Sequence, residues 1–346
     1  MRATVAPEVD RPAAPTPNDR AGSGQPAKSA VTERATALVA ERRPKADALG
    51  RHLASLTEDP DAFASALRAG FLELADPDYR DHQPFIAPGI GPTFGVRWPL
   101  TAAVERGFRE ATRRERPSGF LEIADRLFRD PELEPRWLAF GLLDRLLPVD
   151  AERAWQLLRR AAREATDWIT IDSLAHPVGR GILLEGYRWA ELEQLVYSPS
   201  RWERRLVGST IATLPFVDHR RGRTPDIVVH GLGLIGQLIG DASADVQRAL
   251  SWALRSLVLV DRDGVSVFMT AEAERAAATG DGNRAWVLRD ALSKLDSATA
   301  APIRAGLAGL RRSSPAASTS AASSVAGWSG ADAGPPDGHD LPEPMQ

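Results

Sequence analysis

Residues 131–165, PELEPRWLAFGLLDRLLPVDAERAWQLLRRAAREA, contain the pattern that decides the fold of this chain. Large apolar side chains recur there at helical spacing, at Trp137, Phe140, Leu143 and Leu146. Residues 148–150 then break the pattern, and Asp150 stands where the N-cap of a second run, ending at Ala165, would lie. The segment therefore predicts two consecutive helices joined by a short break.

The same alternation of apolar runs and polar breaks extends along most of the chain. Further helices are predicted over residues 121–128, 201–213, 225–239, 245–258 and 282–312. Two successive helices with their breaks take about 35–45 residues, which is the period of paired-helix repeats that stack side by side. The pattern predicts an all-α fold, a superhelical solenoid of antiparallel helix pairs with a long concave binding surface.

The chain consists of three segments that differ in composition. Residues 1–28 are rich in Pro, Ala, Gly and Asp, and residues 313–346 are rich in Ser, Ala, Pro and Gly. Both are predicted to be disordered tails, because they hold too few apolar side chains to form a core. Residues 29–312 are predicted to form the solenoid domain.

The composition excludes several kinds of site. Because the 346 residues include no cysteine, the chain has no disulfide, no thiolate metal site and no cysteine nucleophile. The six histidines are scattered and form no H-x-x-x-H pair, so we expect no metal. The sequence has neither a Walker A loop nor a G-x-S-x-G motif, and we expect no cofactor.

The sequence gives no sign of export or of a membrane span. The first residues contain no apolar region of the kind found in secretory signals. The longest apolar stretch, residues 227–240, includes His230 and Gln237 and is too short to cross a bilayer. We expect a cytoplasmic protein with no membrane partner.

The distribution of charge is more informative than its sum. The formal net charge is −3, but residues 313–346 hold four acids and no Lys or Arg, which leaves the rest of the chain at +1. Residues 201–255 hold eight Arg against five acids, a net charge of +3. A local basic face that binds nucleic acid is therefore compatible with this acidic chain, although such faces are commonly just solvated.

Residues 226–236, DIVVHGLGLIG, fit the G-x-G-x-x-G pattern of dinucleotide-binding folds, and Asp261 follows where a ribose-binding acid could lie. This would make the protein an NAD(P)-dependent oxidoreductase. The interpretation requires a strand before the glycines and further strand–helix units after them, and the flanking sequence offers neither. We instead expect Gly231, Gly233 and Gly236 to be packing glycines within a helix.

Three short segments place unusual side chains in predicted helices. Trp168 and Asp172 are four residues apart and share one helix face. Arg205 lies near the start of a second helix, and Trp252 and Arg255 are three residues apart on a third. The steps from Asp172 to Arg205 and from Arg205 to Trp252, 33 and 47 residues, are each close to one helical hairpin, so consecutive repeats could bring the three segments together.

Each of these features alone has an ordinary structural explanation. A Trp at helical spacing is usually part of the core, an Asp near a helix start is usually a cap, and an Arg-rich helix is usually a solvated face. The combination is more specific. The order W-I-T-I-D at 168–172, W-E-R-R-L-V at 202–207 and V-Q-R-A-L-S-W-A-L-R at 246–255, preceded by G-V-R-W-P-L at 95–100, resembles the DNA alkylation repair family, the AlkD-like glycosylases built from HEAT-like repeats.

The resemblance covers about residues 85–260 and carries several expectations. It implies a right-handed solenoid of HEAT-like helix pairs with a concave DNA-binding face, which acts as a monomer on double-stranded DNA with alkylated bases. It also implies two groups of functional residues, the active-site Trp168, Asp172 and Trp252 and the DNA-contacting Arg205, Arg248 and Arg255. Two positions depart from the family, because Ile169 replaces a frequent acid and Arg248 replaces a Lys, keeping its charge.

The implied reaction suits these side chains. Alkylation at N3 or N7 gives a purine a positive charge, and the sugar gains cationic character as the N-glycosidic bond breaks. The faces of Trp168 and Trp252 would stabilise cations, by about 0.5–2 kcal/mol each. Asp172 would stabilise the sugar cation and orient or deprotonate a water molecule. Because no lysine nucleophile is required, the expected enzyme is a monofunctional glycosylase of base excision repair.

Two alternatives stay open at this point. A non-enzymatic HEAT-like scaffold that binds DNA or protein would share the fold and the basic inner face. Replacing Asp172 separates the two, because an enzyme would lose base excision and keep DNA binding. The NAD(P)-dependent oxidoreductase is the third interpretation, and a thermal shift with a nicotinamide cofactor tests it.

Overall fold

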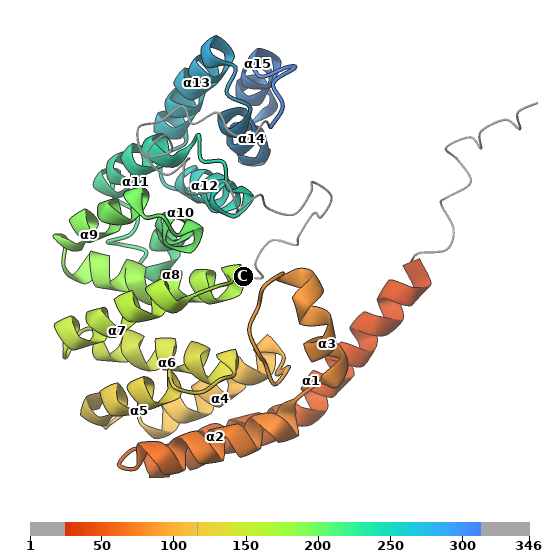
Figure 1. The fold of residues 1–346 in the computed structure, drawn as a ribbon, viewed down its shortest axis with the longest axis vertical. Coiled ribbons are helices and arrows are strands. Elements are labelled where there is room, and N and C mark those ends of the chain that lie inside the picture. The colour runs from red at the N-terminus through yellow and green to blue at the C-terminus, as the bar shows by residue number, and fades with distance from the viewer. Residues whose placement is uncertain (1–24, 116, 313–346) are drawn as a thin grey trace, which may run out of the picture.

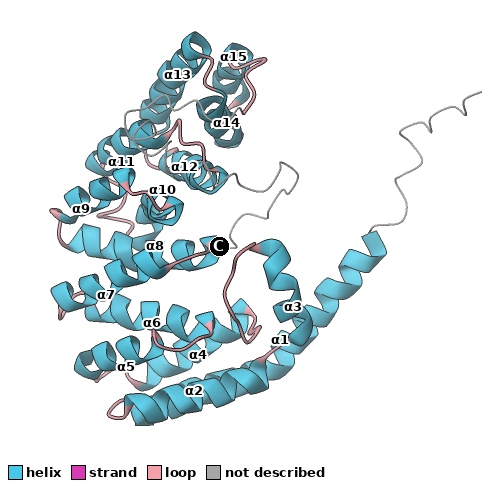
Figure 2. Ribbon diagram, in the orientation of Figure 1, coloured by secondary structure: helices cyan, strands magenta, loops and turns pink. Residues whose placement is uncertain are grey.

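The structure, a computed structural model, describes residues 25–115 and 117–312. These residues form helices joined by short loops, and no strand occurs among them (Figure 2). The α-helices of this part of the chain are α1 (Gln25–Leu53), α2 (Pro60–Leu74), α3 (Pro77–Ile86), α4 (Trp98–Ala111), α5 (Phe120–Leu127), α6 (Leu133–Leu146), α7 (Ala151–Glu164), α8 (Trp168–Leu184), α9 (Arg188–Gln194), α10 (Arg201–Val217), α11 (Pro225–Leu238), α12 (Ala244–Leu257), α13 (Arg262–Thr279), α14 (Gly282–Ala291) and α15 (Ser297–Gly306).

The helices stack in two layers that form a curved solenoid (Figure 1). The inner layer runs through α1, α4, α6, α8, α10, α12 and α14, and each of these helices packs against the next. The outer layer holds α2, α5, α7, α9, α11 and α13, and α15 packs against α13 at the C-terminal end. The predicted all-α solenoid of paired helices is confirmed.

Aspartates begin many of the helices. Seven of them are N-caps whose side chains accept a hydrogen bond from a backbone N–H, namely Asp59, Asp76, Asp150, Asp167, Asp261, Asp281 and Asp296. Such a cap satisfies one of the donors that the first turn of a helix leaves unpaired. Asp150 is the cap that the sequence predicts, and its Oδ1 accepts from the backbone N–H of Arg153 at 3.4 Å.

Some predicted boundaries differ from those in the structure. The run predicted as one helix over residues 282–312 is two helices, α14 and α15, because Asp296 caps a new helix start after a short break. The helix α1 begins at Gln25, within the tail predicted over residues 1–28. The rest of that tail and the tail predicted over residues 313–346 lie outside the described residues.

A continuous apolar core fills the space between the two layers. A charged side chain, that of Arg188, is also buried. Arg188 on α9 is completely buried. Its guanidinium lies 4.5 Å from the centre of the Trp155 ring and donates to the backbone carbonyls of Gly181 and Ala151 at 3.3 and 3.2 Å. A ring face, two carbonyl oxygens and the carboxylate of Glu185, 3.3 Å from Nη2, replace the water that this charge has lost.

The helix α3 and the segment that follows it lie beside the inner layer, on the concave side of the stack (Figure 1). Glu134, at the start of α6, accepts hydrogen bonds from the backbone N–H groups of residues 94–96 at 3.0, 2.8 and 3.2 Å. Burial raises the pKa of Glu134, and these donors oppose the rise. Gly95 has a φ of 84°, and a Cβ there would lie 2.5 Å from the Cβ of Arg80, so only glycine fits.

The glycines of the dinucleotide-like pattern lie within α11. Gly231 packs against α10, because a Cβ there would lie 3.0 Å from Cγ2 of Ile211, whereas no atom lies within 4 Å of a Cβ at Gly233. The expectation that these glycines belong to a helix is confirmed, but Gly233 is not a packing glycine, because the space around it is open. Since no strand precedes them in the described residues, they do not form the phosphate-binding turn of a dinucleotide fold.

The close packing of α10 on α12 can be tested at Gly208. A Cβ added there would lie 2.9 Å from both the backbone carbon and the Cβ of Ala249. We expect Gly208→Ala to push the two helices apart and to lower the free energy of unfolding by about 1–3 kcal/mol, despite the better helix propensity of alanine. Urea unfolding followed by circular dichroism measures the change.

Gly233→Ala is the matched control, because it adds the same methyl group to a helix interior with open space around it. It should raise the free energy of unfolding by about 0.5–1 kcal/mol. Equal effects of the two substitutions would contradict the close approach of α10 and α12.

Candidate active site on the inner layer

The start of α8 is fixed by a chain of hydrogen bonds. Asp167, the N-cap, accepts from the backbone N–H of Thr170 at 2.8 Å and from its hydroxyl at 2.7 Å, and the same hydroxyl oxygen accepts from the indole N–H of Trp137 at 3.0 Å. Burial raises the pKa of Asp167, against the lowering effect of its donors. Trp168 is the first residue of the helix, and its indole N–H donates to the carbonyl oxygen of Ile86 at 3.4 Å.

The side chain of Asp172, one turn along α8, binds two side chains of α10. Its Oδ1 accepts from Nε of Arg205 at 3.0 Å and from the hydroxyl of Ser209 at 2.6 Å, while its Oδ2 accepts from Nη2 of Arg205 at 2.7 Å. The side chains of Asp172 and Arg205 are only 9% and 7% exposed. A bidentate pair of this kind fixes the orientation of the carboxylate as well as its position.

Arg205 connects three helices of the inner layer. In addition to its pair with Asp172 of α8, its Nη1 donates to the backbone carbonyl of Asp245 on α12 at 2.7 Å. Its guanidinium carbon lies 5.8 Å from the centre of the Trp168 ring. Gly208, less than one turn after Arg205, lets the backbones of α10 and α12 approach closely, which keeps the Asp245 carbonyl within reach.

The remaining predicted site residues lie on α12, on the far side of α10 from α8. Trp252 is partly buried against the core. Arg248, one turn before it, has a side chain that is 29% exposed and lies with Nη1 3.4 Å from Oδ1 of Asp245. Arg255 forms an ion pair through Nη1 with Asp290 of α14.

The structure thus brings Trp168, Asp172 and Arg205 together and places the other three predicted residues on α12. The contacts of Arg205 described above are all within the protein, so its role at the DNA backbone stays a prediction. Sequence reasoning missed Ser209, which holds Oδ1 of Asp172. Its spacing of four residues from Arg205 puts both side chains on one helix face, and that spacing is the signal that could have found it.

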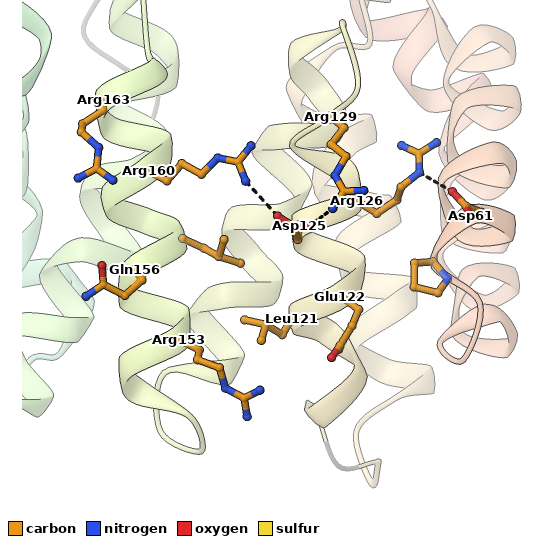
Figure 3. A pocket seen from close by; sticks show the side chains of 12 residues that line it. Asp61, Leu121, Glu122, Asp125, Arg126, Arg129, Arg153, Gln156, Arg160 and Arg163 are labelled. Carbon is orange, nitrogen blue, oxygen red and sulfur yellow. Dashed lines mark hydrogen bonds and ion pairs between the residues drawn. The ribbon is translucent and has the colours of Figure 1, made fainter.

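A cavity of about 790 Å³ lies away from these residues, on the outer helices α5 and α7 (Figure 3). Five arginines line it, namely Arg126, Arg129, Arg153, Arg160 and Arg163. Acids neutralise several of them, since Arg160 pairs with Asp125 at 3.0 Å and Arg126 with Asp61 at 2.6 Å. Because its charges are largely balanced and it contains none of the predicted site residues, we interpret this cavity as part of a solvated outer face.

No group of three or more His, Cys, Asp or Glu side chains is placed to hold a metal ion in residues 25–115 and 117–312. In that same part of the chain, no helix combines the length and the apolar character needed to cross a membrane.

Residues 67–295 match the model of a known protein family, described as DNA alkylation repair enzyme. The match spans well over half of the chain. The chain belongs to the DNA alkylation repair enzyme family. No curated protein matches the chain.

Membership of the DNA alkylation repair enzyme family supports a role in DNA repair, with DNA as the partner. The matched region begins within α2 and ends just after α14, so it includes both the residues around Asp172 and those on α12. It also includes α3 and the segment held by Glu134. The family resemblance found in the sequence is therefore confirmed.

The pairing of Arg205 with Asp172 generates a prediction about stability. Arg205→Ala would leave the buried Asp172 carboxylate with Ser209 as its remaining partner among the contacts described above. Removing one partner of a buried ion pair costs about 3–5 kcal/mol, because the other charge stays out of water. We therefore expect a loss of that size in the free energy of unfolding, measured with urea.

Arg153→Ala is the control for this experiment, because Arg153 pairs with Asp150 at the surface and its side chain is 70% exposed. Its removal should change the free energy of unfolding by less than about 1 kcal/mol. If the two variants are equally stable, the Arg205–Asp172 pair does not hold the inner layer together.

Proposed function

We propose that this protein is a monofunctional DNA glycosylase that hydrolyses the N-glycosidic bond of cationic purines, alkylated at N3 or N7, in duplex DNA, as a step of base excision repair. The observation that carries the proposal is the Asp172 carboxylate, which Arg205 and Ser209 hold one turn from Trp168 on the inner layer. Membership of the DNA alkylation repair enzyme family supports DNA as the substrate.

The hydrogen bonds of Asp172 leave one position of the carboxylate open. A carboxylate has about four lone-pair positions. Arg205 and Ser209 occupy two on Oδ1, and Arg205 occupies one on Oδ2. From the remaining position on Oδ2, Asp172 would orient the water that attacks C1′ of the sugar and take its proton.

The charges balance in this reaction without a covalent enzyme intermediate. The purine leaves with the electrons of the N-glycosidic bond, which neutralise the positive charge that alkylation gave it. The sugar passes through an oxocarbenium-like state, which the negative charge of Asp172 stabilises. Water supplies the oxygen at C1′, so the product is an abasic site in an intact strand.

Arg205 has the role of a positioning residue in this mechanism, since three of its nitrogens hold protein groups. The contacts to DNA phosphates are assigned to Arg248 and Arg255 on α12. Such contacts position a duplex without reading its sequence. Trp252 lies between the two arginines in the sequence, so a backbone bound by both would bring the damaged nucleotide towards its ring.

The large cavity on α5 and α7 is remote from Trp168 and Asp172. We therefore propose that the lesion is recognised on the concave surface rather than by flipping the base into that cavity. The sugar and the backbone would face the protein while the base stays near the stack. Selection would then depend mainly on the charge and the lability of the alkylated base.

One observation favours a second candidate function, a DNA-binding scaffold without catalytic activity. A buried Asp–Arg pair can be purely structural. Arg204 and Asp241 form such a pair nearby, with Nε 2.7 Å from Oδ2 and both side chains 1% exposed. If the pair of Asp172 has the same role, the protein binds DNA without excising bases.

Single-turnover release of 7-methylguanine from an end-labelled duplex, by wild type and by Asp172→Asn, separates the two functions. We expect the variant to release the base about 10²–10³-fold more slowly, because it loses the charge that stabilises the sugar cation. Its affinity for undamaged duplex should stay close to that of wild type.

Asp241→Asn is the matched control, because it removes the same charge from a buried Asp–Arg pair that also involves α10. It should lower stability and leave the release rate per folded molecule unchanged. An equal loss of release in both variants would assign the effect to folding. No release by wild type that binds DNA normally would favour the scaffold.

A further inference from the structure

Phe85, near the end of α3, is the most exposed large apolar side chain in the described residues. It is 74% exposed, although phenylalanine is among the residue types most often buried in proteins. The ring of His82, one turn earlier, lies 5.7 Å from its ring. The helix α3 therefore presents aromatic rings to its surroundings.

These rings adjoin the candidate active site. The residue after Phe85 is Ile86, whose carbonyl oxygen accepts the indole N–H of Trp168. The segment beyond it also touches the loop before α8, because a Cβ at Gly89 would lie 3.7 Å from the carbonyl oxygen of Thr166. Since α3 lies on the concave side of the stack (Figure 1), a duplex that reaches Trp168 would pass close to Phe85.

Phe85 is exposed on a helix that hydrogen bonds hold in place. Asp76 caps the start of α3 and accepts from Nε of Arg97 at 2.7 Å. Gln83, in the middle of the helix, is 2% exposed and accepts a hydrogen bond from the hydroxyl of Thr93. These contacts hold α3 at its start and in its middle. The helix therefore cannot readily turn to bury the Phe85 ring.

We propose that Phe85 packs against the bases of a bound duplex at the lesion, as an apolar wedge between base steps. The proposal rests on the proposed binding of DNA to the inner layer. Phenylalanine is one of the side chains that enter base steps from the minor groove and partly unstack them. An aromatic ring at such a step replaces part of the stacking that the distorted DNA has lost.

The surroundings of Phe85 favour a nucleic acid over a protein partner. Its exposed neighbours on α3 include the polar residues Asp81 and His82 as well as Pro84. A single ring is too small to form a protein-docking surface. It is large enough to fill one base step, close to Trp168 of the proposed active site.

The test compares the affinity of wild type and Phe85→Ala for two duplexes, one fully paired and one with a single tetrahydrofuran abasic analogue. We expect wild type to prefer the abasic duplex, since a wedge enters a weakened step more easily. Phe85→Ala should lose about ten-fold or more of its affinity for that duplex. Phe85→Trp should keep the preference, because its larger ring also stacks.

Val267→Ala is the matched control, because Val267 is an apolar side chain on α13 that is 70% exposed. It should leave both affinities unchanged. If Phe85→Ala binds both duplexes as wild type does, the wedge is excluded, whether or not the protein excises bases. If wild type releases no 7-methylguanine and Phe85→Ala still loses the preference, the wedge stands and the glycosylase proposal falls.

Discussion

A single guanidinium joins the three helices that carry the candidate site. Arg205 of α10 holds the carboxylate of Asp172 on α8 with two N–H groups and the Asp245 carbonyl on α12 with a third. Taking two charges out of water costs several kcal/mol per ion, so such a pair persists only where its geometry is good and its donors are satisfied. The packing of α8, α10 and α12 provides that geometry, and it leaves the side chain of Asp172 9% exposed.

In the proposed mechanism, this arrangement separates the positioning of Asp172 from its chemical role. Asp172 cannot rotate freely, because Arg205 and Ser209 hold both of its oxygens. A preorganised carboxylate stabilises a developing cation without first having to reorient. Trp168 is fixed in the same way, by the capped start of α8 and by the carbonyl of Ile86. The repeat architecture thus supplies an inner surface on which the side chains of α8 and α10 lie next to each other, close to α3.

Features that depend on neighbouring residues in the chain could be predicted from the sequence. The cap at Asp150 and the shared face of Trp168 and Asp172 follow from spacing alone. Contacts between repeats could not be predicted in detail, because they depend on how α8, α10 and α12 are aligned in space. The hydrogen bond from Arg205 to the Asp245 carbonyl is one example, since a backbone oxygen leaves no mark in the sequence. The exposure of Phe85 could not be predicted either, because phenylalanine is a residue type that favours the core.

In the proposed mechanism, Asp172 is held in place to stabilise a cationic sugar. The most direct test measures the affinity of wild type and of Asp172→Asn for two duplexes. One duplex contains a cationic 1-aza-deoxyribose, and the other contains a neutral tetrahydrofuran of the same shape. Because an enzyme binds its transition state most tightly, wild type should bind the cationic duplex at least about 10²-fold more tightly than the neutral one. Asp172→Asn should lose that preference. Equal affinity of wild type for the two duplexes, or an equal preference in the variant, would contradict this role of Asp172.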